Sequence, residues 1–170
     1  MNLKKITEAG DLKGKYVIVR ASLNIPLDNG EVRNAFRINR ALPTLRYLHE
    51  QGARTIVISH LGRKPEETLK PVFAVLENHL PIHWGGSVTD SEFADRRALL
   101  SDGEILLAEN LRQDEREKQN DPEFVELLAG LGEVYVNDGF AEAHREHAST
   151  YGLAQMLPAY AGLTVMEETT

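Results

Sequence analysis

Histidine and arginine side chains cluster in the stretch AEAHREHAST, residues 141–150, at His144, Arg145 and His147. Imidazole and guanidinium groups so close together can bind a metal ion, a nucleic acid or a small anion. The pair His144 and His147 lacks the i, i+4 spacing of a helical zinc pair, and the chain contains no cysteine, so a metal site is not expected. The choice among the remaining ligands depends on where the other cationic side chains lie.

Cationic side chains also follow the other apolar runs of the sequence. These pairings are Arg20 after 16–19, His60 and Arg63 after 55–58, Arg112 after 105–108, and His144 and Arg145 after 134–136. The β-branched character of the first two runs predicts strands buried on both faces, as in parallel sheets. Ligands of open α/β sheets bind outside the carboxyl ends of the strands, so the cations predict an anion site at that edge. Arginine suits phosphate or carboxylate because its planar fork is always charged. A single arginine after a strand is more often a solvated surface charge or part of a local ion pair, so the prediction depends on the agreement among four strand ends.

Helical patterns alternate with these runs, and a weaker strand candidate spans 81–84. One predicted helix follows the apolar face of Ile38, Leu42, Leu45 and Leu48 and stops at Gly52. Others are capped by Thr68, with a stripe from Leu69 to Leu80, and by Asp121, with Pro122 in the first turn; a shorter one lies in 91–100. Residues 114–121 are expected to form a charged loop. The alternation predicts an α/β domain, a three-layer Rossmann-like arrangement with a mostly parallel sheet flanked by helices.

Composition narrows the class of protein. The chain has 170 residues, 42% of them apolar, and a net charge of −7, which suits one globular domain and argues against a nucleic-acid binder. The absence of cysteine suits a reducing cytoplasm, and neither an apolar signal core nor a run of about 18 apolar residues points to a membrane. Neither G-x-x-x-x-G-K-[ST] nor G-x-G-x-x-G occurs, so no nucleotide-phosphate loop is predicted.

Several motifs together resemble the phosphoglycerate kinase family, in the order found there. They are VIVRASLNIPL, FRINRALPTLRYL, SHLGRKP, LKPV, LLAENLR, NDPEF and VYVNDGFAEAHREHAST. The resemblance runs from about residue 12 to residue 168 and covers only the N-terminal half of that enzyme. It implies that residues 1–170 form the N-terminal phosphoglycerate-binding domain and that the C-terminal nucleotide-binding domain is absent.

The family transfers a phosphoryl group between 1,3-bisphosphoglycerate and ADP in glycolysis. The resemblance therefore implies that this chain binds 3-phosphoglycerate or 1,3-bisphosphoglycerate. It implies no cofactor in this chain, because Mg-ATP or Mg-ADP is held by the missing C-terminal domain, and no catalysis by this half alone. A cytoplasmic monomer that binds neither nucleic acid nor membrane is expected.

The resemblance also implies roles for individual residues. Arg37 matches the arginine that steadies charge on the transferring phosphoryl group, a use of a cation expected in such a transition state. His144 matches a histidine in the family's basic patch, and Arg20 matches an arginine near the same site. The residues that match phosphoglycerate contacts are Asn24, Arg37, His60, Arg63, Arg112 and Arg145, with Ser22 at the position of a further contact.

The chain departs from the family around the same positions. Ser22 replaces the aspartate that grips the substrate hydroxyl, and an uncharged hydrogen bond is worth about 1 kcal/mol against about 1.5–3 kcal/mol for a charged one. Ala141 replaces a glycine, and Glu142 adds a negative charge. Phe36 replaces a threonine, and residues 113–114 replace Phe-His. These changes favour an alternative function, a non-catalytic binding or regulatory module derived from this domain.

Overall fold

The computed structural model describes residues 3–25, 27–28, 31–32, 36–59, 66–139 and 147–163. Within these ranges the chain forms a seven-stranded sheet in which every neighbouring pair is parallel. In spatial order the strands are β1 (Lys4–Lys5), β9 (Ala159–Ala161), β8 (Val134–Asp138), β2 (Tyr16–Ala21), β5 (Arg54–Ile58), β7 (Ile105–Ala108) and β6 (Ile82–Gly86). Two short antiparallel strands, β3 (Leu27–Asp28) and β4 (Glu31–Val32), form a separate hairpin.

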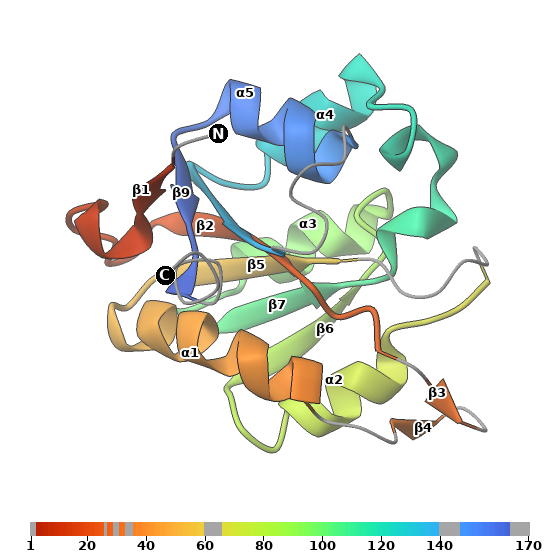
Figure 1. Ribbon diagram of the computed structural model, residues 1–170, viewed down its shortest axis with the longest axis horizontal. Coiled ribbons are helices and arrows are strands. Elements are labelled where there is room, and N and C mark those ends of the chain that lie inside the picture. The colour runs from red at the N-terminus through yellow and green to blue at the C-terminus, as the bar shows by residue number, and fades with distance from the viewer. Residues whose placement is uncertain are drawn as a thin grey trace.

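Helices cover both faces of this sheet, which gives three layers (Figure 1). On one face lie α1 (Phe36–Glu50) and α2 (Lys70–Leu76), and on the other α3 (Ser91–Ala98), α4 (Pro122–Ala129) and α5 (Leu153–Met156). Three-residue 3-10 helices span Ile6–Glu8, Leu111–Gln113 and Glu115–Glu117, and a π-helical turn spans Ala148–Gly152. The fold is therefore the predicted α/β domain with a parallel sheet flanked by helices.

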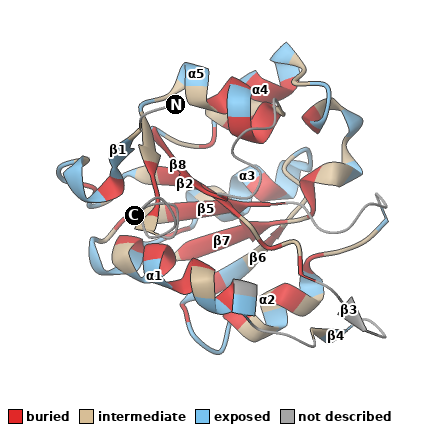
Figure 2. Cartoon of the chain, viewed as in Figure 1, coloured by how far each residue is buried: buried red, intermediate tan, exposed pale blue. Residues whose placement is uncertain are grey.

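The strands alternate their side chains between two hydrophobic cores, so the sheet is buried on both faces (Figure 2). Val17 and Val19 pack into the core beneath α1 and α2, whereas Ile18 packs into the core beneath α3, α4 and α5. Fully burying one such side chain contributes about 1.5–3 kcal/mol. This double burial explains why the central strands are continuous apolar runs in the sequence.

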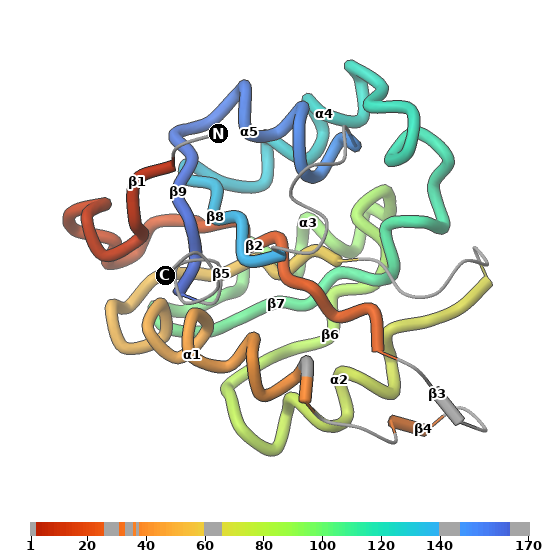
Figure 3. The backbone as a smooth tube through the Cα atoms, viewed as in Figure 1, coloured from red at the N-terminus to blue at the C-terminus, as the bar shows by residue number. Residues whose placement is uncertain are grey.

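The predicted strands are confirmed and extended. The sequence placed one end at residue 19 and another at 136, whereas β2 continues to Ala21 and β8 to Asp138. The weak candidate at 81–84 is β6. The edge strand β1 and its neighbour β9 were not predicted, because two or three residues carry no recognisable alternation. Figure 3 shows that β1, close to the N-terminus, and β9, near the C-terminus, lie side by side.

The predicted helices are confirmed, except that one of them differs at both its start and its end. Asp121 caps α4, since its side chain accepts hydrogen bonds from the N–H groups of Glu123 and Phe124 at 3.0 and 3.1 Å. The helix expected from Thr68 begins instead at Lys70 and ends at Leu76, short of the predicted stripe. At this helix start the N–H of Leu69 donates a hydrogen bond to Glu109, which follows β7. No described helix has the length and apolar character needed to cross a membrane.

Candidate functional site

Four adjacent strands end at one edge of the sheet, in the order β8, β2, β5 and β7. The parallel register aligns them, with Arg20 opposite Asn137 on one side and opposite Ile58 on the other. The segments that carry the predicted anion-binding residues follow these four strands in the sequence. The sheet order therefore gathers at one edge the strand ends that the sequence could show only as separate.

Ser22 and Asn24 lie directly after β2, and both side chains are half-buried. Between them Leu23 is fully buried, and its N–H donates a hydrogen bond to Ser59 Oγ at 3.0 Å. Ile25 is also buried, so the side chains alternate between the core and the surface. Ser22 and Asn24 are thus the less buried residues of this segment, which is bonded to the end of β5 through Ser59.

Arg112 lies in the 3-10 helix Leu111–Gln113, directly after β7. Asn110 caps this helix, because its Oδ1 accepts from the N–H of Arg112 at 3.1 Å. The N–H of Leu111 donates to the carbonyl oxygen of Ser59 at 3.0 Å, and the Leu111 side chain is buried. The half-buried Arg112 is thus fixed beside the end of β5, and Ser59 bonds to the segments after both β2 and β7.

Glu109 connects the segment before α2 to the end of β7 through hydrogen bonds. Its Oε1 accepts from the N–H of Leu69 and from its neighbour Asn110, each at 2.8 Å, and its Oε2 accepts from Thr68 Oγ1 at 2.6 Å. Thr68 in turn accepts from the N–H of Lys70 at 3.2 Å. A carboxylate that follows β7 therefore bonds at the helix start, together with Thr68, to which the sequence had assigned the cap alone. Sequence reasoning missed Glu109, although a charged residue directly after a buried strand is a usable signal.

The end of β8 is connected to α1. Asp138 is buried, and its Oδ1 accepts a hydrogen bond from Thr44 Oγ1 of α1 at 3.0 Å. Thr44 Oγ1 also accepts from the N–H of Leu163 at 2.9 Å. Since Thr44 lies two turns from Arg37 on the same helix, this bond fixes the position of the helix that carries Arg37 relative to the end of β8.

Arg20 does not present its charge to solvent at this edge, contrary to the prediction from its position after residue 19. It is the fifth residue of β2, its side chain is 0% exposed, and its Nε donates to Ser149 Oγ at 2.9 Å. Ser149 Oγ donates to Glu117 Oε2 at 2.5 Å, and the Ser149 N–H donates to Glu117 Oε1 at 2.8 Å. The expected charged loop 114–121 is therefore wrong at Glu117, which is 1% exposed.

Tyr135 completes this buried polar cluster. Its hydroxyl donates to the carbonyl oxygen of Ser149 at 2.7 Å. Burial raises the pKa of the Tyr135 hydroxyl well above its ordinary value, with a smaller raising effect from Glu117 and a lowering effect from Arg20. The tyrosine therefore stays protonated and remains a hydrogen-bond donor at physiological pH.

Comparison with known proteins adds to this geometry. The family model described as phosphoglycerate kinase matches residues 6–170. The chain belongs to the phosphoglycerate kinase family. It is 42% identical to the phosphoglycerate kinase of Methylorubrum populi over 174 residues, covering 98% of this chain and 44% of that protein. It is 43% identical to that of Sinorhizobium medicae over 175 residues, covering 99% and 44%.

Solved structures of the family have the same fold. Phosphoglycerate kinase from Coxiella burnetii superimposes with a TM-score of 0.83 at 33% identity, covering 99% of this chain and 43% of that one. The enzyme from Pyrococcus horikoshii OT3 gives a TM-score of 0.86 at 27% identity, covering 98% and 44%. The chain thus corresponds to the N-terminal domain of the family and spans less than half the length of its relatives.

Several residues implied by the phosphoglycerate kinase resemblance lie outside the described part of the chain. They are His60, Arg63, His144 and Arg145, together with the departures Ala141 and Glu142. The backbone of Arg37 lies in the first turn of α1, and its side chain is outside the description. Ser22, Asn24 and Arg112 are the implied contacts whose side chains the structure describes, and their roles remain predictions.

His147 directly precedes the π-helical turn, and its N–H donates to Thr150 Oγ1 at 3.1 Å. Among the residues that the structure describes, no group of three or more histidine, aspartate or glutamate side chains could hold a metal ion.

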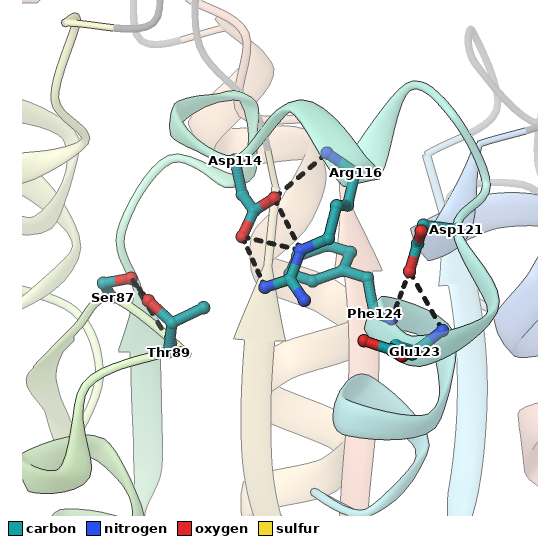
Figure 4. A network of polar contacts seen from close by, with 7 residues as sticks. All are labelled: Ser87, Thr89, Asp114, Arg116, Asp121, Glu123 and Phe124. Carbon is teal, nitrogen blue, oxygen red and sulfur yellow. Dashed lines mark hydrogen bonds and ion pairs between the residues drawn. The ribbon is translucent and has the colours of Figure 1, made fainter.

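A pocket of about 170 Å³ lies one strand beyond Arg112, at the carboxyl ends of β6 and β7. In Figure 4 the Asp114 carboxylate faces Arg116 at 2.8 Å, and the Arg116 guanidinium lies over the Phe124 ring, 5.1 Å from its centroid. Ser87 and Thr89 bond to each other across 2.9 Å. Because these side chains bond to one another, the pocket offers little that is arranged for a ligand. Its lining is Ser87, Val88, Thr89, Glu109, Asn110, Leu111, Gln113, Asp114 and Phe124.

Proposed function

We propose that this chain is the phosphoglycerate-binding half of a phosphoglycerate kinase and that it binds 3-phosphoglycerate or 1,3-bisphosphoglycerate at the carboxyl edge of its sheet. The observation that carries the proposal is the order of four adjacent strand ends, each followed by a motif of the family. The family motifs that follow these strands contain several arginines, and guanidinium groups suit a ligand with a phosphate at one end and a carboxylate at the other.

Each site residue implied by the resemblance has a part in this proposal. Arg63, Arg112 and Arg145 hold the anionic ends of the ligand, with His60 and His144 beside them. Asn24 and Ser22 bind its hydroxyl group. Arg37 is the proposed catalytic residue, which stabilises charge on the transferring phosphoryl group when a nucleotide domain delivers it.

Phosphoryl transfer itself requires a nucleotide-binding partner domain, so this chain alone is proposed to be inactive. Mg-ATP or Mg-ADP binds that other domain in the proposal, and no residue of this chain is assigned to nucleotide or metal. A cytoplasmic location and a monomeric state belong to the same proposal. Robust turnover by the chain mixed with ATP, magnesium and 3-phosphoglycerate would contradict it.

Calorimetric titration with 3-phosphoglycerate tests the binding function. We expect Arg37→Ala, Arg112→Ala and Arg145→Ala each to weaken binding roughly 10- to 100-fold, because a charged hydrogen bond contributes about 1.5–3 kcal/mol. Arg46→Ala is the matched control, since Arg46 is an exposed arginine on α1 and its removal changes the net charge equally. Equal weakening by Arg46→Ala would show that net charge, rather than a site, governs binding.

The second candidate, a non-catalytic module, is favoured by the departures at Ser22, Ala141 and Glu142. It predicts no heat of binding at millimolar 3-phosphoglycerate. The substitution Ser22→Asp separates the two functions, because it restores the charged acceptor that the family uses. We expect it to tighten binding roughly 5- to 10-fold in a functional site, since it replaces a neutral hydrogen bond with a charged one.

A further inference from the structure

A network of buried hydrogen bonds connects three segments that are far apart in the sequence. Arg20 lies at the end of β2, Glu117 lies in the 3-10 helix Glu115–Glu117, and Ser149 lies in the π-helical turn. Arg20 and Ser149 are 0% exposed, and Glu117 is 1% exposed. Ser149 Oγ is the link, because it accepts from Arg20 Nε at 2.9 Å and donates to Glu117 Oε2 at 2.5 Å.

Both Ser149 contacts to Glu117 are needed to satisfy the buried groups. The carboxylate receives the Ser149 hydroxyl on one oxygen and the Ser149 N–H, at 2.8 Å, on the other. A buried charge that loses its partner costs several kcal/mol, whereas a complete set of hydrogen bonds offsets its desolvation. These hydrogen bonds therefore oppose a shift of the three segments, since a shift would break the bonds of the Glu117 carboxylate to the Ser149 hydroxyl and N–H.

These three segments flank residues of the proposed site. Ser22 and Asn24 directly follow the strand that contains Arg20. Arg112 lies five residues before Glu117, and the two short helices between them share Asp114 as end and start. The hydrogen-bond network thus connects the backbone after β2 to the backbone that carries Arg112. The connection runs through Ser149 in the π-helical turn.

We propose that Glu117 and Ser149 are positioning residues for the phosphoglycerate site, which fix the separation between the Arg112 segment and the Ser22–Asn24 segment. This inference rests on the proposed function, because it assigns these buried groups to the geometry of that site. Neither residue touches the ligand in the proposal. They act through Arg20 and through the backbone to which they are bonded.

The test compares ligand affinity in folded variants of the whole chain. Ser149→Ala removes the linking hydroxyl, and Glu117→Gln replaces the two carboxylate acceptors with one carbonyl and one NH2 group, so that one Ser149 donor loses its acceptor. Phe93→Leu is the control. Phe93 is a buried residue of α3, and its replacement lowers the stability of the fold without changing a residue of the hydrogen-bond network. Each dissociation constant for 3-phosphoglycerate is measured at a temperature far below the unfolding midpoint of every variant.

We expect Ser149→Ala and Glu117→Gln each to weaken binding 5- to 50-fold, and Phe93→Leu to change it less than twofold. The double variant should bind no more weakly than the weaker single variant, because both changes break the same link. Ser149→Thr, which keeps the hydroxyl, should restore affinity to within threefold. A purely stabilising role predicts lower unfolding midpoints with unchanged affinity, and this result would overturn the inference.

The outcomes separate this inference from the function on which it rests. If the unaltered chain does not bind 3-phosphoglycerate, the proposed function fails and the inference fails with it. If the unaltered chain binds and the variants bind equally well, only the positioning role is lost. Should Ser149→Ala not fold, the near-isosteric Glu117→Gln decides the question by the same comparison.

Discussion

Replacing the half-buried Glu109 with alanine should destabilise the fold, because its carboxylate bonds to two separate segments of the chain. The carboxylate accepts hydrogen bonds from the N–H of Leu69 at 2.8 Å, from the N–H of Asn110 at 2.8 Å and from Thr68 Oγ1 at 2.6 Å. Leu69 is fully buried, so water does not readily replace the lost acceptor. A buried donor left without a partner costs about 1–3 kcal/mol, and with two backbone donors affected we expect a loss of about 2–4 kcal/mol.

Urea unfolding followed by circular dichroism measures this loss. For an m-value of about 2 kcal/mol/M, the midpoint should fall by roughly 1–2 M. Glu109→Gln keeps one carbonyl acceptor for the backbone N–H groups and loses the charge, so about 1 kcal/mol is expected for it. Glu66→Ala is the control, because Glu66 is an exposed glutamate that lies three residues before Leu69 in the sequence.

A Glu109→Ala variant within 0.5 kcal/mol of the Glu66→Ala control would refute this reasoning. It would mean that the start of α2 finds another cap, and that the contact between Glu109 and Leu69 contributes little to stability. A full effect in Glu109→Gln would instead show that the charge, rather than the number of acceptors, stabilises the helix start.

Three further outcomes follow from single sites. Thr55→Val should raise the free energy of unfolding by about 1 kcal/mol in urea titration, because Thr55 Oγ1 is buried with no hydrogen-bond partner among the described residues; a loss would show a hidden partner. Gly152→Ala should lower the free energy of unfolding by about 1–3 kcal/mol, because a Cβ atom there would lie 2.5 Å from Val125 Cγ2. An unchanged unfolding midpoint would contradict this packing. The hydrogen bond from Arg116 lowers the pKa of Asp114, so the stabilisation from this pair is present above about pH 4 and disappears as the pH falls through the lowered pKa. The stability difference between Asp114→Asn and the unaltered chain should therefore shrink between about pH 5 and pH 2, and a constant difference would exclude this ionisation as the cause.

Local patterns in the sequence determined the class of the fold. The sequence runs that form β2, β5, β7 and β8 are mostly apolar on both faces of the strand. Such runs are typical of the central strands of parallel sheets, which are buried on both faces. The cap at Asp121 was predictable for the same reason, because a side chain bonds there to backbone only two and three residues away. The phosphoglycerate kinase family could also be predicted from the sequence, because its short motifs occur in the same order in this chain.

Only the tertiary structure decided which polar residues work together. Glu109 caps a helix that begins some forty residues earlier, and Glu117 bonds to Ser149 across 32 residues. Arg20 looked like a surface cation because its sequence neighbours do not reveal that Ser149 covers it. Periodicity and capping express contacts within a few residues of each other, whereas the order of strands in the sheet determines which distant residues meet. The residue types at the site were therefore readable from the sequence, and their burial and partners were not.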